Sequence, residues 1–229
     1  MFRRHQLVEI SAAGREYLFD NRLSFAAPVT DDVLRQLIID GVAGVKIPGI
    51  VKRQDDPRDG YLEIGMAFPV RVEEMRVRVF GHIPEDAVTG IISPYEVAAR
   101  YQGGTSAREQ VITRLLAICR EMGIGAGLFG SSALAVVTGL PYCHEGSDID
   151  LYVSSNDPAA LEQLYVLSRQ LEAESGVRTD IEVELPGDFA VKMKELYSSS
   201  YSVMAKGLHT VELFDKDEAF KMLQQNKKI

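Results

Sequence analysis

The chain has 229 residues, of which 46% are hydrophobic and 25% charged, and its formal net charge at pH 7 is −8. This composition is ample for a buried core in one large domain or two small ones. No run approaches the roughly 18 apolar residues that a membrane span needs. The N-terminal stretch MFRRHQLVEISAAGREYLF has arginines but no sustained apolar segment after them. We therefore expect a soluble, cytoplasmic protein with no membrane partner.

The negative net charge argues against non-specific binding to DNA or RNA, which depends on many contacts between basic side chains and phosphates. A nucleic acid polymer is therefore not expected as a partner. A nucleotide is still compatible with this charge, because Mg²⁺ and one or two basic side chains can neutralise a triphosphate locally. Cys119 and Cys143 form neither a disulfide framework nor a paired zinc site, and we expect both to be free thiols.

Short β-like runs separated by turn-rich segments fill the first half of the chain. The runs cover residues 44–52, 61–66 and 75–80, and the segment at 55–60 has the composition of a turn. A helix is expected over residues 31–40, with Thr30 as its N-cap. The pattern predicts a smaller β-rich domain over residues 1–100.

Helices and strands alternate after a linker at residues 101–105. Ser106 and Glu109 have the spacing of a capping box at the start of a helix that reaches Met122. Asp157 caps a second long helix with Pro158 at its first position. The full set in this half comprises helices at 106–122, 132–138, 158–174, near 189–196 and from 217, and strands at 126–129, 149–153, 178–185, 202–206 and 209–213. The fold class expected over residues 106–229 is α/β (α+β), a mixed sheet flanked by helices.

Residues 129–153 contain the most informative pattern, a Gly-Ser pair followed by a short helix and then Ser-Asp-Ile-Asp-Leu. On a strand, Asp148 and Asp150 share one face, and acidic oxygens held at fixed spacing are what Mg²⁺ needs. Asp180 on a neighbouring strand is the candidate third carboxylate and metal ligand, and Glu182 on the same strand face is the alternative for this role. The pattern predicts nucleotidyl transfer with Mg²⁺ as cofactor and these three aspartates as catalytic residues.

The candidate substrate-binding residues surround the acidic pair. Gly130 and Ser131 are expected to cradle phosphate oxygens with their backbone N–H groups at a helix start. His144 and Ser147, in the loop before Asp148, are candidates for binding substrate, and His144 in particular for contacting phosphate or accepting a proton. Lys206, at the end of a strand, is a candidate for binding the pyrophosphate leaving group. Each has an alternative reading as an ordinary turn, loop or surface residue.

The motif resembles the phosphoribosyl-dephospho-CoA transferase family, also called malonate decarboxylase holo-acyl-carrier-protein synthase, within the nucleotidyltransferase superfamily. The similarity rests on Gly130-Ser131, the Gly-Leu-Pro at 139–141, His144 and the segment 147–151, with looser similarity around Asp180 and Lys206. His5-Gln6-Leu7 is similar to the family's His-Asp-Leu opening, with Gln6 in place of the acid.

The resemblance implies a reaction that transfers phosphoribosyl-dephospho-CoA from 2'-(5''-triphosphoribosyl)-3'-dephospho-CoA to a serine of the acyl-carrier subunit of malonate decarboxylase, releasing pyrophosphate. Asp148 and Asp150 would hold Mg²⁺, and Asp180 would complete the metal site and help to activate the serine hydroxyl. By elimination, the N-terminal half recognises the carrier protein or the dephospho-CoA moiety. Two alternatives stay open: another Mg²⁺-dependent nucleotidyltransferase, such as one that moves AMP from ATP, and a nucleotide-binding module without catalysis.

Overall fold

The structure is a computed structural model and describes residues 1–26, 28–144 and 146–225. The chain forms two compact units. The first comprises residues 1–93 and 137–142, and the second comprises residues 94–136 and 143–229. The main boundary between the units therefore falls after Ser93, and the first unit also includes residues 137–142 from within the motif region.

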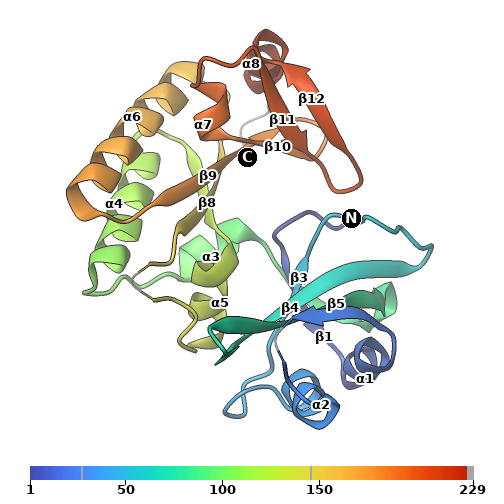
Figure 1. Ribbon diagram of the computed structural model, residues 1–229. Helices are drawn as coiled ribbons and strands as arrows, with labels where there is room; N and C mark the ends of the chain where they lie inside the picture. Colours follow the sequence, from blue (N-terminus) through green and yellow to red (C-terminus); the bar gives the residue numbers. More distant parts are fainter. Residues whose placement is uncertain (27, 145, 226–229) are drawn as a thin grey trace. The chain divides into compact units, whose positions relative to one another are not determined.

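The first unit contains a six-stranded antiparallel sheet, within the described residues, in the order β2-β5-β4-β3-β1-β6 (Figure 1). Its core is made by alternate residues of the long strands, such as Leu62, Ile64 and Met66, all buried. Its elements are β1 (Leu7–Ile10), α1 (Ala12–Asp20), β2 (Arg22–Ala26), α2 (Asp31–Ile39), β3 (Gly49–Val51), β4 (Tyr61–Val72), β5 (Met75–Pro84), a 3₁₀ turn η1 (Glu85–Ala87) and β6 (Val88–Ile92).

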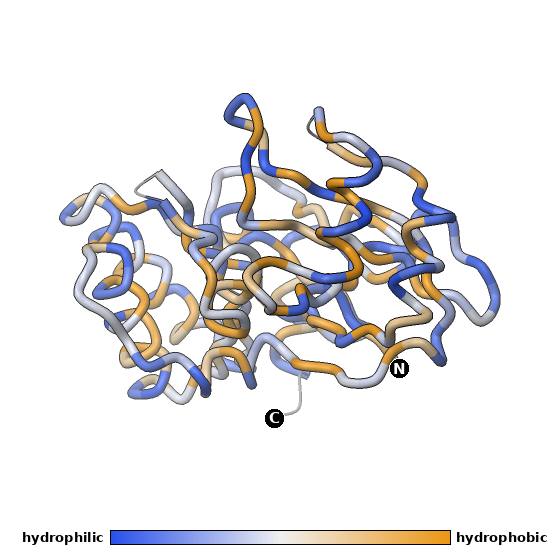
Figure 2. Tube along the Cα trace, turned by 90° about the horizontal axis from the view of Figure 1, so that it is seen from below, coloured by the Kyte–Doolittle hydropathy of each residue, from blue (hydrophilic) through white to orange (hydrophobic). Residues whose placement is uncertain are grey.

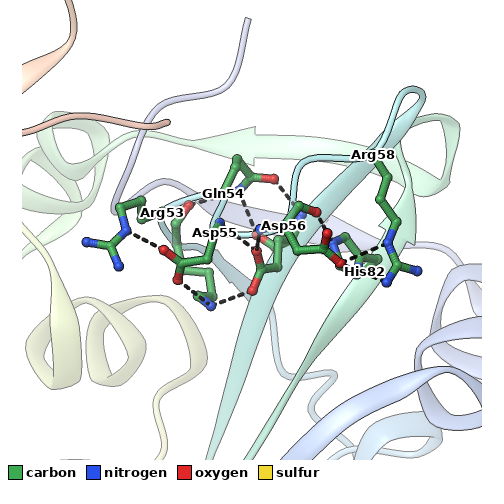
Figure 3. Close-up of polar contacts among 8 residues, drawn as sticks. Arg53, Gln54, Asp55, Asp56, Arg58 and His82 are labelled. Atoms are coloured by element: carbon green, nitrogen blue, oxygen red, sulfur yellow. Dashed lines mark hydrogen bonds and ion pairs between the residues drawn. The ribbon is translucent and has the colours of Figure 1, made fainter. Parts of the chain in front are cut away.

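The turn between β3 and β4 is held by a buried carboxylate. Glu63 forms an ion pair with Lys52 and accepts hydrogen bonds from the backbone N–H groups of Asp55, at 2.9 Å, and Asp56, at 3.3 Å. Gln54 exchanges two further hydrogen bonds with the Glu63 backbone, at 2.7 and 3.0 Å. Figure 3 shows these turn residues gathered above β4 and β5. Satisfied buried polar groups of this kind fix a loop geometry, so this acidic turn has a structural explanation.

The second unit contains a six-stranded mixed sheet, again within the described residues, in the order β12-β11-β10-β9-β8-β7, with β8 and β9 parallel and the other pairs antiparallel. Helices α4 and α6 lie side by side against it (Figure 1). Its elements are α3 (Pro94–Arg100), α4 (Ala107–Glu121), β7 (Gly125–Leu128), α5 (Gly130–Thr138), β8 (Ile149–Ser154), α6 (Pro158–Ser175), β9 (Thr179–Leu185), β10 (Phe189–Lys192), α7 (Met193–Leu196), β11 (Ser202–Lys206), β12 (Val211–Asp215) and α8 (Lys216–Gln225). The predicted fold class is confirmed.

Three of the predicted helix starts are confirmed in detail. The Thr30 side chain accepts a hydrogen bond from Val33 N at the start of α2. Both hydrogen bonds of the capping box between Ser106 and Glu109 are present at the start of α4. Asp157 accepts from two backbone N–H groups at the start of α6. Local hydrogen bonding of this kind can be read from sequence because both partners lie within one turn.

The helix predicted near residues 189–196 is wrong in its first half. Residues 189–192 form strand β10, which pairs with β9, and only Met193–Leu196 is helical. The reason is the hairpin turn before it, in which Gly187 and Asp188 adopt φ angles of 80° and 63°. These left-handed conformations reverse the chain and place the next residues in the sheet.

Hydrophobic and hydrophilic residues interleave along the whole trace, as Figure 2 shows. Among the described helices, none combines the length and the apolar character that crossing a membrane would require.

Candidate functional site

Three predicted carboxylates come together at the amino-terminal ends of β8 and β9. In the parallel pairing of these strands, Asp150 lies opposite Asp180, and adjacent strands are about 4.8 Å apart. Ile149 and Leu151 are fully buried on the other face, which directs Asp150 to the open side of the sheet. Asp148 directly precedes β8, and its charge acts on the Asp150 carboxylate.

The Gly-Ser element contacts Asp150 directly. Gly130 begins α5 with a φ of 61°, and a Cβ there would lie 2.0 Å from Asp150 Oδ2. Only glycine allows the helix start to approach the carboxylate this closely. The backbone N–H of Ser131 donates a hydrogen bond to Asp150. The helix start therefore holds the aspartate in place, and its Ser131 N–H already has a partner in the protein.

Asp150 carries charge that the protein does not balance. Burial, followed by the charge of Asp180, raises the pKa of Asp150 to about 6, while Arg108 and the Ser131 N–H act in the opposite direction. Within the described residues no side chain forms an ion pair with Asp150. A divalent cation at this carboxylate would relieve the repulsion.

The two outer carboxylates, by contrast, each hold a cation. Arg178 Nε lies 2.7 Å from Asp148 Oδ1. Lys192 Nζ lies 2.7 Å from Asp180 Oδ2 and 3.0 Å from Asp180 Oδ1. As the side chains stand, both oxygens of Asp180 are taken by one ammonium group.

Arg108 of α4 holds the backbone of the segment that carries Asp148 and Asp150. Its guanidinium is buried and donates to Ser132 Oγ at 2.6 Å, to the Asp148 carbonyl at 3.0 Å and to the Ser147 carbonyl at 3.3 Å. One side chain of α4 thus joins the start of α5 to the segment that carries the aspartates. It is a positioning residue.

Sequence reasoning missed Arg108, Arg178 and Lys192. A signal existed for Arg108, because it occupies the apolar face of α4 together with Val111, Ile112, Leu115 and Cys119. An arginine on a buried helix face needs hydrogen-bond partners and marks an internal anchor. Lys192 had no such signal, because its neighbour Asp180 is known only once the β9–β10 pairing is known.

The loop before Asp148 is organised by its own turn. His144 N donates to Ser147 Oγ at 3.1 Å, and Ser147 N donates to the His144 carbonyl at 2.9 Å. His144 Nδ1 accepts from Gly146 N at 3.2 Å. Both predicted substrate-binding side chains therefore take part in one turn next to Asp148, and a role toward substrate stays a prediction for each.

Lys206 is placed away from the carboxylates. It ends β11 opposite Ala190, and Ala190 lies opposite Glu184 of β9. Glu184 is four residues beyond Asp180 on that strand, a displacement of about 13 Å along the sheet. The lysine that the sheet brings to Asp180 is Lys192.

The donor set suits Mg²⁺ held jointly with substrate. Across the described ranges, no three His, Cys, Asp or Glu side chains are arranged to hold a metal ion by themselves. Mg²⁺ commonly uses only one or two carboxylates and completes its octahedron with substrate phosphates and water. Asp148 and Asp150 meet that requirement. Asp180 as a third ligand would first have to release Lys192.

Comparison with known proteins gives a consistent result along the chain. Residues 3–94 match the N-terminal domain, and residues 96–217 the C-terminal domain, of phosphoribosyl-dephospho-CoA transferase MdcG. No solved structure matches.

Curated relatives with the name phosphoribosyl-dephospho-CoA transferase occur in several bacteria. The protein of Xanthomonas euvesicatoria is 27% identical over 175 residues, covering 76% of this chain and 81% of the relative. The protein of Azotobacter vinelandii is 26% identical over 167 residues, covering 69% and 74%. The protein of Bradyrhizobium diazoefficiens is 21% identical over 215 residues, covering 94% and 91%. The resemblance found from the motif is confirmed, and the chain belongs to the phosphoribosyl-dephospho-CoA transferase family, a family of transferase enzymes.

Proposed function

We propose that this protein transfers the phosphoribosyl-dephospho-CoA group from 2'-(5''-triphosphoribosyl)-3'-dephospho-CoA to a serine of the acyl-carrier subunit of malonate decarboxylase, with release of pyrophosphate. The observation that carries the proposal is the register of β8 and β9, which sets Asp150 beside Asp180 and next to the Gly130 helix start. Family membership supports the nature of the transferred group.

Asp148 and Asp150 would hold Mg²⁺, which neutralises triphosphate charge and aligns the phosphates for attack. The raised pKa of Asp150 fits this role, because an unbalanced carboxylate gains most from a divalent cation. Gly130 and Arg108 keep the two carboxylates in register by fixing the backbone on either side. Catalysis in phosphoryl transfer comes mainly from such alignment and from charge stabilisation.

In the proposed reaction the acceptor serine Oγ forms a bond to the α-phosphorus. The bond from that phosphorus to the oxygen bridging to the β-phosphate breaks, and pyrophosphate departs with both bonding electrons. Asp180, beside Asp150, is the proposed acceptor of the hydroxyl proton. We assign recognition of the carrier protein or the dephospho-CoA moiety to the first unit.

The test is a transfer assay with purified protein, Mg²⁺, the apo carrier subunit and either the triphosphoribosyl precursor or ATP. Intact-mass measurement of the carrier subunit should show addition of phosphoribosyl-dephospho-CoA from the precursor and no addition from ATP. Addition of AMP from ATP would show that ATP is the donor substrate and would leave the assigned site residues unchanged. An absence of transfer from either donor, with the precursor still bound, would favour a nucleotide-binding module.

A further inference from the structure

Lys192 is the side chain most closely tied to the carboxylates, and none of the comparisons assigns it a role. It ends β10 opposite Glu182 of β9, on the sheet face that also carries Asp180. Its ammonium lies within 3.0 Å of both Asp180 oxygens. We propose that Lys192 binds the oxygens of the departing pyrophosphate and covers Asp180 when the site holds no substrate. This inference rests on the proposed function.

The partly open position of the pair allows such an exchange. The side chains of Lys192 and Asp180 are 23% and 28% exposed, so a ligand can reach the ammonium from solvent. A lysine carries a compact charge on a flexible four-carbon chain, which can move from a carboxylate to a phosphate without a backbone change. A buried and sealed ion pair would lack this freedom.

The charge of the ligand supplies the driving force, because the acids around Lys192 by themselves hold its ammonium at Asp180. Lys192 stands among the negative charges of Asp180, Glu182 and Glu195. A triphosphate with one Mg²⁺ bound still carries net negative charge, so its terminal oxygens compete with Asp180 for the ammonium. Transfer of Lys192 to the phosphate leaves Asp180 open beside the metal carboxylates, where it can accept the serine proton.

The sheet register favours Lys192 over the other basic candidates. Lys206 lies one strand further from β9 and at the level of Glu184. Arg178, which pairs with Asp148 through a single nitrogen, is 74% exposed. The pyrophosphate role that the sequence suggested for Lys206 is therefore better met by Lys192.

The test compares Lys192→Met with a matched control, Lys194→Met, which removes an exposed lysine two residues later. Mn²⁺ binding is measured by electron paramagnetic resonance without substrate. Binding of tripolyphosphate is measured by titration calorimetry in the presence of Mn²⁺. These two readouts need neither the carrier protein nor turnover.

Lys192→Met should lower the affinity for tripolyphosphate by about tenfold to a hundredfold, because one charge-assisted contact is lost. Its Mn²⁺ affinity should stay equal or rise, because Asp180 is no longer covered. Lys194→Met should leave both affinities unchanged. Lys192→Arg should restore a large part of the tripolyphosphate affinity. If the methionine variant folds poorly, the affinity of Lys192→Arg is compared with that of wild type in its place.

Unchanged tripolyphosphate affinity in a folded Lys192→Met variant would overturn the inference, and so would an equal loss in Lys194→Met. The wild-type transfer assay separates this result from the proposed function. Transfer by wild type with normal tripolyphosphate binding in Lys192→Met refutes only the lysine assignment. Lysine-dependent tripolyphosphate binding without transfer to the carrier refutes the proposed function and leaves Lys192 as a phosphate-binding residue.

Discussion

At the scale of single residues, Asp150 combines the strongest constraints in the second unit. It is confined by Gly130 on one side and by Asp180 on the other, and it accepts a hydrogen bond from the Ser131 backbone. A carboxylate placed in this way costs folding free energy once it is ionised. The site is therefore expected to be less stable without metal than an uncharged version of the same structure.

Replacing Asp150 with Asn tests that cost. The folded pKa, about 6, lies above the ordinary value of 3.8, so the folded state binds more protons than the unfolded state between these pH values. The stability of the metal-free wild type then falls as pH rises through that window, and the full cost is present above it. Asn cannot ionise. We expect Asp150→Asn to be about 3 kcal/mol more stable than wild type at pH 7.5 and to lack transfer activity.

Urea denaturation with EDTA, at pH 7.5 and at pH 4, measures this difference. The gain should be largest at pH 7.5 and should shrink toward pH 4, where the folded-state carboxyl of Asp150 is almost fully protonated and little of the ionisation cost remains. A variant that is destabilised equally at the two pH values would contradict the assigned pKa and its cause.

The individual residues differ in how far sequence could place them. Asp148, Asp150, Gly130 and Ser131 lie in one short stretch, and a strand after a glycine-led helix brings them together by local geometry. Arg178 and Lys192 act through strand pairing with distant segments, which no local pattern specifies. The acidic residues of the site were therefore predictable from the sequence, whereas the basic side chains of Arg178 and Lys192 beside them are known only from the structure.

At the scale of elements, α4 links the second unit's core to the site. Its capping box was predictable because Ser106 and Glu109 lie in one turn. The destination of Arg108 was not predictable, because its partners at Ser132, Ser147 and Asp148 belong to other elements. Strand β10 was misread for a related reason, since four residues carry too little periodicity to separate strand from helix.

Two arginines of α4 offer a matched comparison. Arg108→Met leaves one hydroxyl and two backbone carbonyls without their donor, and should lower the free energy of unfolding by about 2–3 kcal/mol. It should also weaken Mn²⁺ binding, because the backbone before β8 loosens. Arg114 forms an exposed ion pair with Glu174 at 3.3 Å, so Arg114→Met should change stability by less than about 0.5 kcal/mol.

Chemical denaturation and Mn²⁺ titration of both α4 variants provide the measurement. Similar losses in the two variants, or intact Mn²⁺ binding in a folded Arg108→Met protein, would show that Arg108 is an ordinary buried residue with no part in positioning the carboxylates.

At the scale of the whole molecule, the motif is continuous in sequence but divided between the two units. Residues 137–142 belong to the first unit, whereas Gly130 and Asp148 belong to the second. Tyr142 is buried, donates to the Ala67 carbonyl at 2.8 Å and stacks beneath the Arg76 guanidinium at 5.4 Å. The Gly-Leu-Pro segment that pointed to the family is thus a connection anchored in the first unit.

This division explains which features of organisation were predictable. A change from β-rich to alternating composition is visible along the chain and marks the two halves. A short return of the chain into the first unit leaves no compositional trace, because it depends on contacts of Tyr142 with Ala67 of β4 and Arg76 of β5, which lie 75 and 66 residues earlier in the chain. Strands β1 and β6, which pair with each other across most of the first unit's sequence, were missed for the same reason.

We propose that Asp148 and Asp150 hold a divalent cation together with a triphosphate. Crystals of the protein grown with Mn²⁺ and tripolyphosphate test it most directly, through the anomalous scattering of manganese. We predict a manganese peak between the carboxylates of Asp148 and Asp150, with tripolyphosphate oxygens completing its coordination. A peak at other residues, or tripolyphosphate bound without manganese at these aspartates, would contradict this metal site.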